Sequence, residues 1–132
     1  MKKSQGGFTL IELVVVIVLL GILGVTALGK FQNLSDDASD AATQGVASEI
    51  SAGSAINFAE GVVQNPAAYP VPIAGASCTN ALLAPLLASG VMPTGITVSG
   101  AAVCAGAGGS IECTFTHANG TTPAVVGIIC TG

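Results

Sequence analysis

The sequence predicts an α+β fold in which a long N-terminal helix packs against a small antiparallel sheet domain that disulfides hold together. Three observations support this prediction. No proline occurs before Pro66, and the apolar run that begins at Phe8 leads into a helical pattern. Residues 111–117 alternate apolar and polar side chains, as a half-buried strand does. All four cysteines lie in the second half of the chain.

The predicted helix has an apolar part and an amphipathic part. Phe8 to Leu28 is long enough and apolar enough to span a bilayer. Apolar or small residues then recur every three or four positions, which predicts a helix that continues to about Gly61 and a rod of roughly 80 Å. Two helices broken near Gly29 are the alternative. The recurring positions are Phe31, Leu34, Ala38, Ala42, Val46, Ile50, Gly53 and Ile56.

The remaining chain reads as a small β-rich domain. Prolines and glycines predict a loop over residues 62–78. Thr79 or Asn80 can cap a short helix, which Pro85 should interrupt because proline lacks the backbone N–H that a helix interior needs. Residues 96–103 are predicted to form a strand.

A hairpin is predicted from residues 111–117 and 125–130, joined by a turn at Ala118–Thr122. Its register is placed with Phe115 opposite Ile128. In that register Cys113 lies opposite Cys130 on the same face of the hairpin, at disulfide distance.

The hairpin register therefore favours a Cys113–Cys130 disulfide and leaves Cys78–Cys104 by elimination. Four cysteines permit three connectivities, so this pairing is one of three. An even number of cysteines behind a membrane-targeting N-terminus indicates an oxidising compartment, with buried free thiols as the alternative.

Composition argues against several classes of function. Only 8% of the residues are charged, with three basic and seven acidic side chains and a net charge of −4, so a groove for nucleic acid is not predicted. There is no CxxC motif, and one histidine is too few for a Cys/His zinc site. His117 stands beside the predicted turn with no nucleophile pattern near it. No catalytic residue, metal or cofactor is predicted, and the chain is not expected to be an enzyme.

The N-terminus differs from a secretory signal peptide. Lys2 and Lys3 come first, and Gly6 and Gly7 precede the apolar run, whereas a signal peptide has its small-residue cleavage site after that run. Cleavage at the glycines would leave the hydrophobic segment on the mature protein. The lysines would keep the leader in the cytoplasm and direct the rest outward.

Residues 7–12, GFTLIE, resemble the leader and cleavage motif of type IV prepilins and pseudopilins, and the short basic leader and Phe8 match the type IVa subclass. Residues 27–38 are similar to pilins of the mannose-sensitive haemagglutinin type, although such pilins commonly have proline where this chain has Gly29. The resemblance implies that a prepilin peptidase cuts after Gly7 and methylates Phe8, and that Glu12 acts in assembly.

Glu12 can also be interpreted from physical chemistry. An acid within an apolar membrane segment is unfavourable by a few kcal/mol and usually has a partner. Cleavage before Phe8 would create an amino group that is largely cationic at pH 7. Glu12 could then pair with that amine in its own chain or in a neighbouring copy, and the pair between copies would fix how helices pack. The alternative is a carboxylate that reaches the membrane edge.

The predicted organisation is a cleaved cytoplasmic leader (1–7), a transmembrane and filament-core helix (8–29), an amphipathic helix (30–61) and a globular β-rich head (62–132). Gly29 and the glycines before it should weaken the helix. We expect this stretch to be the part of the helix that melts or stretches in a filament.

The predicted function is that of the major structural subunit of a type IV pilus, which polymerises into a helical surface filament for adhesion, attachment or twitching motility. Expected partners are identical subunits, a prepilin peptidase, and the assembly ATPase and platform proteins. The chain would reside in the inner membrane as a single-span precursor and then in the extracellular pilus. A type II secretion pseudopilin is the alternative. A single-span anchored binding domain and an electron-conducting filament are further alternatives.

Overall fold

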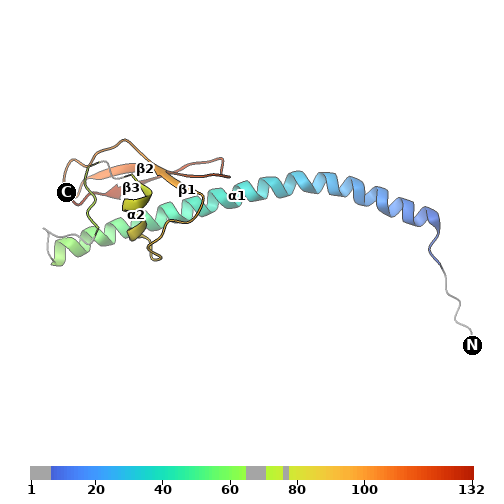
Figure 1. The fold of residues 1–132 in the computed structure, drawn as a ribbon, viewed down its shortest axis with the longest axis horizontal. Helices are drawn as coiled ribbons and strands as arrows, with labels where there is room; N and C mark the ends of the chain where they lie inside the picture. Colours follow the sequence, from blue (N-terminus) through green and yellow to red (C-terminus); the bar gives the residue numbers. More distant parts are fainter. Residues whose placement is uncertain (1–6, 65–70, 76–77) are drawn as a thin grey trace, which may run out of the picture. The chain divides into compact units, whose positions relative to one another are not determined.

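The computed structural model describes residues 7–64, 71–75 and 78–132. The described chain divides into two compact units, Met1–Ser35 and Asp36–Gly132, and we call the second the head unit. One helix supplies residues to both units. The head unit adds a short helix and a three-stranded antiparallel sheet, so the predicted α+β class is confirmed (Figure 1).

Helix α1 spans Leu10–Gln64 without interruption, which confirms a single helix and rules out a break at Gly29. It continues three residues beyond the predicted end near Gly61. Gly61 is buried, so this glycine allows close packing instead of ending the helix. In the sequence, Pro66 follows two residues after Gln64, and the residue before a proline disfavours helical geometry.

The face of α1 that packs in the head unit is only partly the face that the sequence predicted. Ile50 is fully buried as expected, but Ile56 is 68% exposed and Leu34 is 62% exposed. The buried face carries mostly small or polar side chains: Thr43, Ala47, Ile50, Ser54 and Asn57.

This choice of face follows from close backbone approach. A Cβ atom at Gly53 would collide with the carbonyl oxygen of Leu86, so the helix and the segment after it can meet closely only at a glycine. The polar side chains on the buried face are acceptable because they are hydrogen-bonded. Asn57, for example, donates to the oxygen of Val71 and accepts from its N–H, both at 2.8 Å.

The sheet has the order β1-β2-β3, with β1 at Ile96–Ser99, β2 at Ser110–His117 and β3 at Ala124–Ile129. Alternation along β2 is confirmed, because Ile111, Cys113 and Phe115 are buried and the intervening side chains are more exposed. This face packs in one core with Ile50 of α1, and the other face carries the exposed residues, as in a one-sided antiparallel sheet. Strand β1 is shorter than the predicted 96–103.

Side chains from the helices bond backbone groups of both outer strands. Ser51 donates to the oxygen of Gly127 at 2.9 Å, and the N–H of Ile129 donates to Ser54 at 3.2 Å. On β1, the amide of Asn80 bonds the oxygen of Ile96 at 2.9 Å and the N–H of Val98 at 2.7 Å. These bonds occupy groups that an outer strand would otherwise offer to another chain.

The short helical segment forms as the sequence predicted. Thr79 is the N-cap of α2 (Asn80–Leu83), and its hydroxyl accepts from the N–H of Leu82. Pro85 lies in the 3₁₀ helix η1 (Ala84–Leu86), so the helix is interrupted at this proline. Of the predicted loop over 62–78, residues 62–64 belong to α1 and residues 71–75 are irregular, while 65–70 and 76–77 lie outside the described residues.

The predicted disulfide pairing is wrong. The structure joins Cys78 to Cys113, with Cα atoms 5.4 Å apart, and Cys104 to Cys130, with Cα atoms 5.7 Å apart. Neither Cys113–Cys130 nor Cys78–Cys104 forms. The cause is the hairpin register, in which Cys113 lies opposite Val126 and not opposite Cys130.

The register differs from the predicted one by four residues, because Phe115 lies opposite Ala124 and not Ile128. Side chains alternate with a period of two, so a shift of four leaves every side chain on the same face, and the apolar pattern cannot distinguish the two registers. A contact from outside the sheet holds the turn. The carboxylate of Asp40 on α1 accepts from the backbone N–H of Thr121 at 2.9 Å and of Thr122 at 3.1 Å.

Candidate functional site

The start of α1 carries a capping box made by Thr9 and Glu12. The Glu12 carboxylate accepts from the Thr9 backbone N–H at 2.9 Å and from the Thr9 hydroxyl at 2.7 Å. In return, the N–H of Glu12 donates to the Thr9 hydroxyl at 3.4 Å. Because Leu10 is the first helical residue, Thr9 is in the N-cap position and Glu12 is the third helical residue, which is the spacing of this motif.

The capping box supplies the otherwise unpaired amides of the first helical turn with acceptors. It also places a carboxylate at the positive end of the helix dipole. A role for Glu12 was predicted from the sequence, but the capping role of Thr9 was not. The signal was present, since a threonine followed three positions later by a glutamate ahead of an apolar run is typical of a helix start.

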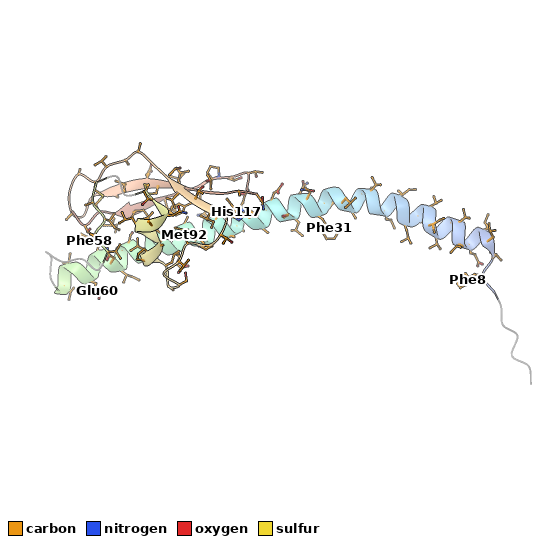
Figure 2. The ribbon with its side chains drawn as sticks, in the orientation of Figure 1. Phe8, Phe31, Phe58, Glu60, Met92 and His117 are labelled. Atoms are coloured by element: carbon orange, nitrogen blue, oxygen red, sulfur yellow. A yellow bond between two sulfur atoms is a disulfide. The ribbon has the colours of Figure 1, made fainter. Side chains whose placement is uncertain are left out.

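The helix around Glu12 is exposed and apolar. Phe8 is 90% exposed and Ile11 is 69% exposed, and these two side chains line a shallow hollow of about 390 Å³ with Glu12, Val15 and Val16. Figure 2 shows Phe8 at the start of the helix and the side chains of the following turns projecting outward. A surface of this kind is typical of an element that lies in lipid or against other chains.

Helix α1 is long enough and apolar enough to cross a membrane, judged by its length and composition. Its most apolar window has a mean hydropathy of 2.8, and none of that window is buried inside the chain. The helix therefore differs from the apolar core helix of a globular protein, whose side chains are mostly buried.

Gly7 is exposed, and a Cβ atom added to it would meet nothing within 4 Å. Packing within the described chain therefore does not require a glycine at this position. Phe8 follows Gly7 directly, so the predicted cleavage would fall between these two residues. Lys2, Lys3 and Gly6, the other residues of the predicted leader, lie outside the described residues.

The chain's one histidine lies in the described part of the head unit. His117 is half-buried at the end of β2, and its Nδ1 accepts from the N–H of Asn119 at 3.1 Å. Among the residues that the structure describes, no group of three or more His, Cys, Asp or Glu side chains could hold a metal ion.

The N-terminal segment is similar to a known protein-family model. The model described as the prokaryotic N-terminal methylation motif matches residues 2–28. This chain carries the methylation motif. The matched segment includes the Gly7–Phe8 bond, Glu12 and the whole apolar run from Phe8 to Leu28. No curated protein and no solved structure gave a significant match to the chain.

The methylation motif and the exposed apolar part of α1 belong to the same N-terminal segment. The family model covers residues 2–28 and none of residues 29–132, so it describes the N-terminal segment alone. The apolar helix and the motif fit a precursor that is anchored in a membrane. Thr9 and Glu12, which form the exposed capping box, lie within the segment that the family model matches.

Proposed function

We propose that the chain is the major structural subunit of a type IV pilus of the mannose-sensitive haemagglutinin type. The observation that carries this proposal is the methylation motif at residues 2–28, together with large apolar side chains that are all exposed from Phe8 to Leu34. An exposed apolar surface of this extent needs a cover, first lipid and then the helices of other subunits. Adhesion, attachment or twitching would follow from the polymer.

In this proposal the peptidase cuts between Gly7 and Phe8 and methylates the new amine of Phe8. Residues 8–29 form the membrane and filament-core helix, residues 30–61 the amphipathic helix, and residues 62–132 the globular β-rich domain.

Assembly in this proposal uses the pair between Glu12 and the amine of Phe8 on a neighbouring subunit. Glu12 is exposed at the helix start, where an incoming chain can reach it. The capping bonds with Thr9 orient the carboxylate before a partner arrives. A paired charge is tolerated among apolar helices, whereas an unpaired one is costly, so the pair would select one packing register.

Three measurements test the proposal. The intact mass of the exported protein should lack residues 1–7 and include one methyl group on Phe8, and a mature protein that begins elsewhere would contradict the assignment of the cleavage site. Electron microscopy of sheared surface material should show filaments made of this chain. Deletion of its gene should remove those filaments and leave protein secretion intact.

The type II secretion pseudopilin is the alternative that the methylation motif equally allows. It predicts the opposite result from the gene deletion, with secreted enzymes retained in the periplasm and surface filaments unaffected. The head unit favours the pilin, since two disulfides join its segments and its sheet exposes Thr97 and Thr116.

A further inference from the structure

The head unit has a groove on the side of α1 where the predicted apolar stripe remains exposed. The groove has a volume of about 370 Å³ and lies between α1 and the segment that includes η1. Its apolar lining comes from Ala52, Ile56, Pro85, Leu86 and Leu87.

Two carboxylates, Glu49 and Glu60, also line the groove. The backbone N–H of Ala88 donates to Glu49 at 2.8 Å, which fixes this carboxylate at the groove wall. The groove is therefore apolar at its floor and acidic at its wall, and a complementary partner would present a cation beside a large apolar side chain.

The chain itself contains such a segment. After removal of residues 1–7, Lys30 is the one basic side chain left against seven acids. The positions three and four residues away on either side of it hold no acid, so Lys30 lacks the ion pair that a helix commonly provides along its own surface. Phe31 and Leu34, on the same side of the helix, are 70% and 62% exposed, and Phe31 projects freely (Figure 2).

We propose that the groove of the head unit binds residues 27–34 of a second copy of this chain, with Lys30 of that copy paired to Glu49 and with Phe31 and Leu34 on the apolar floor. This contact rests on the proposed polymerisation and names a partner segment for it. The mode is that of an amphipathic helix in a groove, where apolar anchors supply affinity and a charge fixes the register.

The proposed contact sets a stagger between copies. Lys30 and Glu49 are nineteen residues apart on α1, so two parallel copies in this contact would be displaced by about 28 Å along the helix direction. The pair would act together with Glu12 at the helix start. Each copy would then use both of its cations, the amine of Phe8 and Lys30, on acids of other copies.

A charge-swap experiment on the full chain in cells tests the proposal. Lys30→Glu and Glu49→Lys should each lower the mass of sheared filaments at least tenfold, because each places two like charges together at every repeat of the contact. The double variant should recover at least half of the wild-type mass. Lys30→Glu combined with Glu112→Lys is the matched control, since Glu112 is exposed on β2 and away from the groove, and it should not recover.

Photo-crosslinking gives a second readout that does not depend on the folding of charge variants. A benzophenone amino acid is placed at position 31 of the otherwise unchanged chain, and the filaments are sheared from the cells. On irradiation, this residue should crosslink to peptides that contain residues 49–60 or 85–88. Crosslinks confined to other peptides would overturn the proposal, as would normal filament mass in Lys30→Glu. The absence of filaments from the wild-type chain would instead contradict the proposed function, so the two failures are distinguishable.

Discussion

At the scale of single residues, Glu12 has two candidate partners. In the isolated chain it accepts two bonds from Thr9, and in the proposed filament it would accept the amine of a neighbouring Phe8. The capping interaction lies at an exposed helix start, where solvent weakens it. Leaving a charge unpaired among packed helices costs several kcal/mol, so pairing between subunits should dominate the effect of Glu12 on assembly.

Glu12→Ala should therefore leave insertion, cleavage and folding intact but reduce surface filaments to near zero. Thr9→Ala is the matched control, because it removes the cap and keeps the carboxylate, and it should lower filament numbers only slightly. Membrane fractionation, intact mass and filament counts give the three readouts. Equal loss of filaments in both variants would mean that Glu12 acts only as a helix cap.

At the scale of elements, the β2–β3 turn is held to α1 by one carboxylate. Asp40 accepts from the backbone of Thr121 and Thr122 and from the Thr121 hydroxyl at 3.0 Å. Gly120 is required beside it, since a Cβ atom there would lie 2.5 Å from the carboxylate of Asp40. The hydrogen bond from the Thr122 backbone is the main cause that lowers the pKa of Asp40 below its ordinary value of 3.8.

A lowered carboxyl pKa means that the folded state favours the charged form. The contribution of Asp40 to stability is thus complete above about pH 4, the unfolded value, and is lost as the pH falls through the lower folded value. Asp40→Asn should lower the urea midpoint at pH 6, and its difference from the wild-type chain should shrink toward pH 3. A difference that stays constant with pH would show that the charge of Asp40 does not hold the turn.

At the scale of the whole molecule, two disulfides with overlapping loops hold the head together. One closes 35 residues and the other 26, and the stretch from Cys104 to Cys113 belongs to both loops. Cys113 is in β2, and the other three cysteines lie outside the helices and strands: Cys78 before α2, Cys104 between β1 and β2, and Cys130 directly after β3. The bonds therefore tie irregular segments, which contribute few ladder hydrogen bonds, to the sheet.

Replacing Cys104 and Cys130 together by alanine should lower the free energy of unfolding by about 3.5 kcal/mol, the loop-entropy value for a loop of this length. Denaturant unfolding of the oxidised and variant chains in detergent measures the difference.

Non-reducing peptide mapping of the wild-type chain should recover a Cys78–Cys113 peptide. A Cys113–Cys130 peptide would instead support the register that the sequence predicted.

Local patterns were sufficient to predict the long helix, the alternating strand at 111–117, the break at Pro85 and the motif around Gly7 and Glu12. Each depends on residues within a few positions of one another, so the period of side-chain direction or the chemistry of one residue determines the result. The Thr9 cap belongs to the same class and could have been predicted from its spacing to Glu12.

The buried face of α1, the hairpin register and the disulfide pairing were decided only by tertiary contacts. Helix α1 is apolar on more than one side, and the close approach at Gly53 selects the side that the head covers. A register shift of four residues conserves the alternation of β2, and the bonds from Asp40, 81 residues before Thr121, fix the turn. Contacts between segments so distant in sequence leave no local periodic signal, so the amino-acid pattern alone could not reveal them.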